Sequence, residues 1–161
     1  MSINSLEFRK TLANLASSVC IISTVFEEEI HGITISSFTS LSLDPPMILF
    51  CLGKHSKKYQ YFQDTKLVGV SILNSSQDYL SNNFSRNHEN YWDSVDIMLG
   101  EQSKCPIIKD SLGFLECGIE AKYDGGDHTI FTAKVINHGK LNDFSPLIHF
   151  RSEYWAINSK E

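Results

Sequence analysis

Short apolar runs rich in β-branched residues recur along this chain, and each ends at a charged, glycine or proline turn. Three of them lie at residues 19–26, 47–52 and 67–73, and a longer pair at 112–123 and 128–138 flanks the turn Asp124-Gly125-Gly126-Asp127. Runs of this composition predict β-strands, and a glycine-containing turn between two of them is typical of a hairpin. The pattern therefore favours a sheet built from antiparallel strands.

The remaining segments predict further strands and a few short helices. Residues 5–18 carry apolar side chains at helical spacing, and residues 54–64 and 76–84 also predict helices. Residues 31–35 predict a strand that pairs with residues 19–26, and the last two strands are expected at 147–150 and 153–157. Residues 85–104 are polar and aromatic, which predicts an excursion from the core of a kind that is often functional.

Together these elements predict a mainly β fold, an antiparallel β-barrel with short peripheral helices. The chain of 161 residues fits one domain, and we expect residues 1–161 to form it. The sequence has neither a GxGxxG nor a GxxxxGK pattern, so neither of the nucleotide-binding loops that depend on those motifs is indicated.

Charge and cysteine usage exclude several functional classes. Fourteen basic and nineteen acidic residues give a net charge of −5, which offers no long-range attraction to nucleic acid or to an anionic membrane. The four cysteines lack metal-ligand spacing, so we expect no metal site and, as reduced thiols, a cytoplasmic location. No apolar run approaches the roughly 18 residues of a membrane span, and the N-terminus has no signal-peptide pattern.

The most unusual segment is GITISSFTSLSLDPP at residues 32–46. Six hydroxyl side chains fall within nine residues, namely Thr34, Ser36, Ser37, Thr39, Ser40 and Ser42. Hydroxyls and backbone amides on an extended segment suit the edge of a polar, planar ring such as a flavin. The alternative is a Ser/Thr-rich strand and turn with one solvent-exposed face. Composition alone supports both interpretations equally.

A second group of polar residues opens the strand at 128–138. His128 follows a Gly-Gly-Asp turn and is able to donate to a carboxamide or phosphate or to stack on a ring. The alternative is an ordinary surface histidine. Lys57, Lys58 and Arg86 are the basic residues best placed, near predicted helix ends, to meet a phosphate.

These features together resemble the short-chain flavin reductase family, the FMN-binding split barrels that supply reduced flavin to two-component monooxygenases. The resemblance begins with FRKTLANLASSVCIIST at residues 8–24 and continues through HGITISSFTSLSLDPPMILFCL at 31–52. It ends with GDHTIFTAKV at 126–135 and PLIHFRSEYW at 146–155. Residues 87–104 depart from the family pattern, with bulky Tyr91 and Trp92 where a small apolar residue is common.

The resemblance implies a role for specific residues. Thr34, Ser36 and Ser37 would contact the ribityl chain and ring edge of the flavin, and Ser40, Leu41 and Ser42 would line the isoalloxazine. Ser56, Lys57, Ser85 and Arg86 would hold the phosphate. His128 would touch the nicotinamide nucleotide, and Tyr154 would lie near that pocket. No general acid or base is required, because the flavin carries the redox chemistry.

The resemblance also implies cofactors and partners. FMN or FAD would accept hydride from NADH or NADPH, the protein would be a homodimer with flavin at the subunit interface, and a monooxygenase would be the partner. Three alternatives stay open: a non-enzymatic FMN-binding sensor or storage protein, a reductase of ferric iron, and a reductase of a corrinoid. The residues choose neither between the two nicotinamide cofactors nor between the two flavins.

Overall fold

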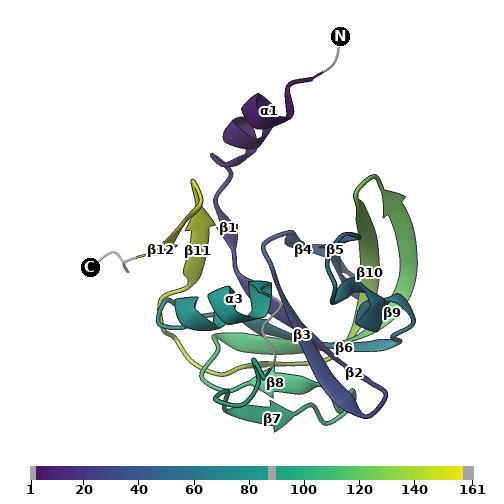
Figure 1. Cartoon of the computed structure of the whole chain (residues 1–161). Helices are drawn as coiled ribbons and strands as arrows, with labels where there is room; N and C mark the ends of the chain where they lie inside the picture. Colours follow the sequence, from purple (N-terminus) through teal and green to yellow (C-terminus); the bar gives the residue numbers. More distant parts are fainter. Residues whose placement is uncertain (1–2, 87–89, 158–161) are drawn as a thin grey trace.

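A computed structural model describes residues 3–86 and 90–157 and shows a mainly β chain (Figure 1). The helices are α1 (Ser5–Leu12), α2 (Tyr59–Gln63) and α3 (Asp78–Ser85). The strands are β1 (Ser17–Ser18), β2 (Cys20–Phe26), β3 (Glu29–Ile35), β4 (Phe38–Leu43), β5 (Pro46–Gly53), β6 (Leu67–Ile72), β7 (Ile97–Leu99), β8 (Pro106–Ile108), β9 (Gly113–Gly125), β10 (His128–Lys140), β11 (Leu147–Phe150) and β12 (Glu153–Ala156).

One seven-stranded antiparallel sheet, in the order β3-β2-β6-β9-β10-β5-β4, forms the body. The expected hairpin of β9 and β10 forms, but its turn is shorter than predicted, because Gly125 and Asp124 pair with His128 and Thr129 and only Gly126 and Asp127 remain between the strands. The sheet curls, because β3 and β5 come into contact although four strands separate them in the sheet order. The predicted fold class, antiparallel and mainly β with short outer helices, is confirmed.

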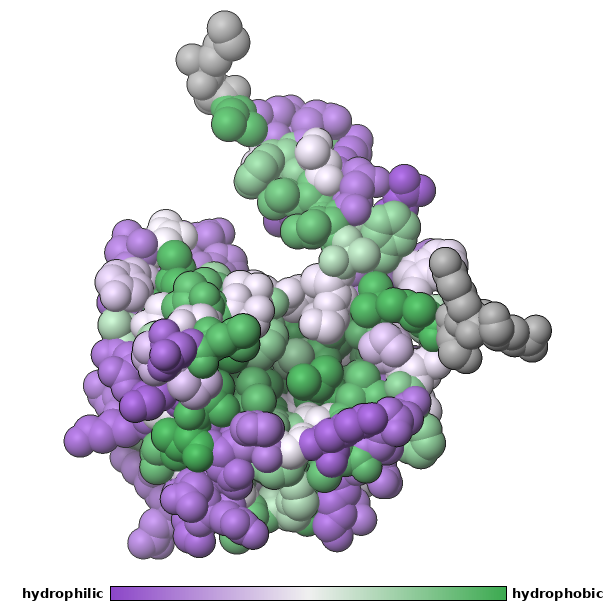
Figure 2. Space-filling model, turned by 180° about the vertical axis from the view of Figure 1, so that it is seen from behind, coloured by the Kyte–Doolittle hydropathy of each residue, from purple (hydrophilic) through white to green (hydrophobic). Residues whose placement is uncertain are grey.

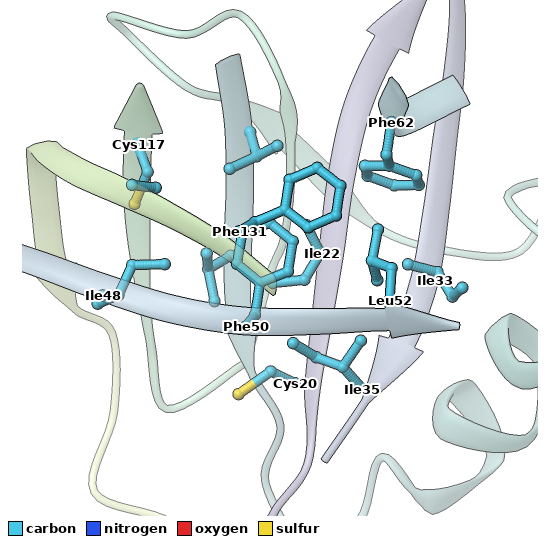
Figure 3. Packing of buried hydrophobic residues seen from close by; sticks show 13 residues of the cluster. Cys20, Ile22, Ile33, Ile35, Ile48, Phe50, Leu52, Phe62, Cys117 and Phe131 are labelled. Atoms are coloured by element: carbon cyan, nitrogen blue, oxygen red, sulfur yellow. The ribbon is translucent and has the colours of Figure 1, made fainter. Parts of the chain in front are cut away.

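The main core lies inside this curl (Figure 3). Alternate residues of β5, namely Ile48, Phe50 and Leu52, point inward and are almost fully buried. The ring of Phe50 stacks on Phe131 of β10 with 5.0 Å between centroids. Full burial of a large apolar side chain stabilises a fold by roughly 1.5–3 kcal/mol, so this period-two pattern fixes which face of the sheet turns inward.

A second cluster packs α3 against the sheet. Leu80 and Phe84 are buried on the inner side of α3, and Phe84 meets Trp92 edge to face with ring centroids 4.5 Å apart. The contact requires a glycine on the strand below, since a Cβ at Gly32 would lie 2.6 Å from Phe84 and 2.7 Å from Trp92. Part of the excursion predicted over residues 85–104 is therefore packed against α3, and the excursion also contains the strand β7. Residues 87–89 of this segment lie outside the described residues.

The predicted helix over residues 5–18 is wrong in its length. α1 ends at Leu12, and Ser17 and Ser18 pair instead with His149 and Ile148 of β11. The helix has no buried residue and stands away from the body (Figure 1). Three other elements differ. Residues 38–43, expected only as a polar run, form β4, and residues 106–108, for which no element is predicted, form β8. The helix expected at 54–64 is shortened to α2.

A buried carboxylate holds the loop between β7 and β8. Glu116 of β9 is fully buried and accepts hydrogen bonds from the backbone amides of Glu101, Gln102 and Ser103 at 2.6–3.1 Å. The Ser103 hydroxyl and the Asn137 amide donate to it at 2.8 and 2.6 Å. Every donor that surrounds the carboxylate therefore favours its ionised form.

No helix among the described residues is both long enough and apolar enough to cross a membrane. The part of the chain described here also contains no cluster of three or more His, Cys, Asp or Glu residues placed to hold a metal ion.

Candidate functional site

The hydroxyl-rich segment 34–42 spans the end of β3, a short turn and most of β4. Thr34 donates from its hydroxyl to the Ser81 carbonyl of α3 at 2.7 Å. The Ser81 hydroxyl lies 2.7 Å from the Tyr154 hydroxyl of β12. The structure thus brings Thr34 and Tyr154 together across α3, although 119 residues separate them in the sequence.

The serines after Thr34 lie at the surface. Ser36, Ser37 and Ser40 are exposed, and Ser37 donates from its hydroxyl to the Cys51 carbonyl at 2.9 Å. The β4–β5 register shifts between Ser40 and Ser42, which leaves Leu41 as an extra, exposed residue in β4. Such a bulge re-aims neighbouring side chains. Because β4 is an edge strand, one row of its backbone groups is free to pair with a ligand.

The predicted phosphate ligands come from two segments that lie side by side. The Lys58 ammonium is buried and donates to the Phe84 carbonyl near the end of α3 at 2.9 Å. This bond brings the residues before α2, Ser56 and Lys57, next to Ser85 and Arg86 at the end of α3. Lys57, Ser85 and Arg86 are exposed, and the Ser56 hydroxyl accepts only from the nearby Lys58 amide at 3.2 Å.

Lys58 itself is held in an apolar setting. Its ammonium lies 3.7 Å from the centre of the Tyr91 ring, a cation–π contact that adds to the hydrogen bond. Burial lowers the pKa of Lys58 to about 8. Lys58 therefore ties α2 to α3, while Lys57 beside it is the cation exposed to a ligand.

His128 lies at the first position of β10, opposite Gly53 at the end of β5. Its Nδ1 is 2.7 Å from a carboxylate oxygen of Asp127, and about half of its side chain is exposed. This hydrogen bond with His128 lowers the pKa of Asp127. The imidazole lies over Gly53, where a Cβ would stand 3.5 Å from Nε2.

The end of β5 joins these groups. Cys51 carries the contact to Ser37, Gly53 lies against His128, and the Gly53 carbonyl accepts from the Ser56 amide at 3.1 Å. Ser37, His128 and the residues that follow β5, Ser56 and Lys57, therefore surround one strand end. Ser40, Leu41 and Ser42 lie beside the other end of β5, opposite Ile48 and Met47. Thr34 and Tyr154 meet at α3.

Residues 12–158 match the family described as the flavin reductase like domain. The chain belongs to this family. The resemblance given by the serine-rich segment and the Gly-Asp-His turn is thereby confirmed.

Relatives within the family agree with this assignment. The chain is 36% identical over 134 residues to an NADH-dependent FAD reductase of Streptomyces globisporus. The aligned region covers 81% of this chain and 73% of the relative. Among solved structures, the NADH:FAD oxidoreductase of the same organism in complex with NAD and FAD fragments superposes with a TM-score of 0.91 at 30% identity, covering 96% and 93% of the two chains. The styrene monooxygenase flavin reductase of Pseudomonas putida S12 superposes with a TM-score of 0.86 at 30% identity. The superposition covers 96% of this chain and 99% of that one.

Sequence reasoning missed Ser81, which bridges Thr34 and Tyr154. Its signal was a small polar residue beside Leu80 and Phe84 on the buried side of a short helix. His31 and Tyr61 were also missed. Their rings stack with centroids 3.7 Å apart. This contact joins β3 to α2, and no local sequence pattern predicts it.

Proposed function

We propose that this protein is an NADH-dependent flavin reductase that takes hydride from the nicotinamide and reduces free or exchangeable flavin. The observation that carries the proposal is the exposed, hydroxyl-rich edge of residues 34–42 in a chain of the flavin reductase family. Its hydroxyls and free backbone groups match the donors and acceptors along the edge of a flavin ring. The relatives are reductases, which favours an enzyme over a sensor or storage protein.

The residues present fit a flavin. Ser36, Ser37 and Ser40 with the bulge at Leu41 and Ser42 would hold the ring edge, and Thr34 would orient the segment through α3. Ser56, Lys57, Ser85 and Arg86 would hold the phosphate, since the Lys58 bond to Phe84 gathers them. A phosphate needs this local positive charge because the chain as a whole is acidic.

The flavin supplies the redox chemistry by accepting hydride at N5 from C4 of the nicotinamide. The task of the protein is to stack the two rings about 3–3.5 Å apart. In this proposal His128, oriented by Asp127, holds the nicotinamide nucleotide. Tyr154, linked to Thr34 through Ser81, would lie near the nicotinamide pocket. No side chain is asked to transfer a proton.

The proposal covers residues 1–161 as one domain and a location in the cytoplasm, where free cysteines such as the four of this chain stay reduced. A flavin-dependent monooxygenase is the proposed consumer of the reduced flavin, as the name of the Pseudomonas putida relative says of that protein. Ferric iron and corrinoids, the other acceptors considered from the sequence, are not part of the proposal.

A homodimer is also part of the proposal. α1 leaves Leu6, Phe8 and Leu12 more than half exposed, and Figure 2 shows apolar side chains along this helix and over the hollowed surface beneath it. On β4, Leu43 is 93% exposed. Large apolar groups gathered in this way mark an interaction surface. A second copy of this chain is the proposed occupant, so that β4 and its flavin edge lie at the interface.

NADH consumption by the purified protein tests the proposed function. We expect oxidation of NADH that depends on added FMN or FAD, with riboflavin a poorer acceptor. Tightly bound flavin with no NADH oxidation would instead support a binding protein, and oxidation that needs a ferric or corrinoid acceptor would overturn flavin as the substrate.

Replacing Arg86 by alanine should weaken FMN more than riboflavin. A charge-assisted contact with phosphate is worth about 1.5–3 kcal/mol, or roughly 10- to 150-fold in Kd. Fluorescence titration with the two flavins measures the difference, and Lys134→Ala, which removes an exposed cation from β10, is the matched control. Equal losses for FMN and riboflavin would show that Arg86 is an ordinary surface arginine.

Replacing His128 by alanine should raise the apparent KM for NADH by roughly three- to tenfold, the value of one lost hydrogen bond. The kcat falls as well if the rings are misaligned, while flavin affinity stays the same. His138→Ala, at an exposed position of the same strand, is the control for steady-state kinetics and thermal melting. An unchanged kcat/KM in a stably folded variant would remove His128 from the site.

A further inference from the structure

The ammonium of Lys58 lies where α2, α3 and residues 90–93 meet. It donates to the Phe84 carbonyl at 2.9 Å and lies 3.7 Å from the centre of the Tyr91 ring. The Tyr91 hydroxyl in turn accepts from the Gly32 amide of β3 at 3.2 Å. Lys58 is only 5% exposed. An apolar side chain would fill a buried position at lower cost, which indicates a role for the charge itself.

The Phe84 carbonyl belongs to the negative end of α3. Carbonyls in the last turn of a helix have no partner within the helix, and they carry partial negative charge. Phe84 is the last residue but one of α3, which has no basic residue of its own in its last turn. Ser85 and Arg86, proposed to hold the flavin phosphate, lie at the same end. A phosphate placed there is repelled by the helix end unless a cation covers these carbonyls.

Lys58 also positions the other phosphate segment through its backbone. Its amide donates to the Ser56 hydroxyl at 3.2 Å. Its carbonyl accepts from the Tyr61 amide at 3.1 Å, in the first turn of α2. The backbone of Lys58 thus joins Ser56 and Lys57 to α2, while its side chain anchors the same segment to the end of α3.

We propose that Lys58 is a positioning residue for the flavin phosphate. It neutralises the carbonyl end of α3 and holds Ser56 and Lys57 beside that end, while its own ammonium stays on the Phe84 carbonyl. The inference rests on the proposed function, because it takes the phosphate to bind between these two segments. Riboflavin has no phosphate, so its binding does not depend on Lys58.

The charge of Lys58 is lost in the alkaline range. Burial lowers its pKa to about 8, so the side chain is charged below that pH and neutral above it. A neutral amine loses the cation–π contact and the charge assistance of its hydrogen bond. The preference for FMN over riboflavin should therefore be complete at neutral pH and decline as pH rises beyond about 8.

Other ionisable side chains surround Lys58. Burial lowers the pKa of His31 and raises the pKa of Tyr91, so both titrate further from this range. Arginine keeps its charge at alkaline pH, and the Lys58→Arg variant therefore separates the titration of Lys58 from that of its neighbours. These neighbours are Glu28, Glu29 and His31 of the β2–β3 hairpin, Lys57 and Tyr61 at α2, Tyr91 and Asp93 of residues 90–93, and Arg86 at the end of α3.

Fluorescence titration of the full-length protein with FMN and with riboflavin, in the absence of NADH, tests the inference. In the wild type, FMN affinity should fall by about fivefold or more between about pH 7 and about pH 9.5, while riboflavin affinity changes little. Lys58→Met keeps the length of the side chain but removes its charge. It should weaken FMN by about fivefold or more at neutral pH, leave riboflavin unchanged and abolish the pH dependence. Lys66→Met, at an exposed position between α2 and β6, is the matched control and should behave as the wild type.

Lys58→Arg should keep the preference for FMN and lose its decline at alkaline pH. Three results would overturn the inference: a wild-type preference for FMN that does not change with pH, equal effects of Lys58→Met on the two flavins, or a decline that persists in Lys58→Arg. The wild-type pH series needs no variant, so it stands even if a variant does not fold. Binding of neither flavin would refute the proposed function as well. A protein that shows the predicted decline but does not oxidise NADH would refute the proposed function alone.

Discussion

Replacing Phe8 and Leu12 together by glutamate should convert the protein from a dimer of twice 18.2 kDa into a monomer. The two residues are one helical turn apart on α1, so they share a face, and about half of each is already covered. Burial of the remainder is worth roughly 1 kcal/mol for each side chain. Losing two such side chains from each of two copies therefore raises the Kd of the dimer by about a thousandfold. The added charges raise the Kd further. Light scattering at micromolar concentration measures the change.

Because the flavin edge of β4 is proposed to lie at the same interface, the double variant should also bind flavin more weakly. Lys10→Glu also places a carboxylate on α1, at an exposed position on the side away from Phe8 and Leu12, and should remain a dimer with normal flavin affinity. A wild-type protein of only 18.2 kDa would contradict the proposed assembly and leave the apolar surface of α1 without an explanation.

Replacing Glu116 by alanine should lower the free energy of unfolding by roughly 3 kcal/mol or more. The variant removes the acceptor of the backbone amides of Glu101, Gln102 and Ser103, of which Ser103 is buried. Each hydrogen bond to a charged group is worth about 1.5–3 kcal/mol. Chemical denaturation measures the loss. Glu120→Ala, at an exposed position of the same strand, should change stability by less than about 0.5 kcal/mol. Similar values for the two variants would show that the loop does not depend on Glu116.

The same carboxylate gives the fold a pH dependence. Burial raises the pKa of Glu116, but hydrogen bonds from Ser103, Asn137 and Gln102 outweigh it, and the net pKa lies below the ordinary value. In the unfolded chain the group protonates first as pH falls. Its contribution is therefore complete above the ordinary carboxylate range and is lost as pH falls toward the lowered value. The difference in stability between wild type and Glu116→Ala should shrink in acid.

The longer apolar strands and the unusual serine-rich segment could be predicted from the sequence because their signals are local, whereas β4, β7 and β8 were not predicted. The unbroken apolar run at residues 47–52 predicts a buried strand, and the structure buries Ile48, Phe50 and Leu52 of β5. The turn before His128 likewise predicts a hairpin, and β9 and β10 form it. Such patterns depend on neighbours in the chain.

Tertiary contacts decided the rest. The helical spacing of residues 5–18 is real, but Ser17 and Ser18 gain strand partners in β11, and such pairing overrides helix propensity. The role of Lys58 as a tie between α2 and α3 depends on the carbonyl of Phe84, 26 residues away. The bridge through Ser81 depends on Tyr154, 73 residues away. Contacts over these separations leave no periodic signal in one sequence.

Anaerobic mixing of the purified protein with FAD and NADH tests the central claim most directly. The account predicts loss of the oxidised flavin absorbance at the rate at which NADH is consumed, one NADH for each FAD, with no added oxygenase. Air should restore the flavin spectrum. Flavin that stays oxidised while it is bound, with NADH unconsumed, would contradict the account.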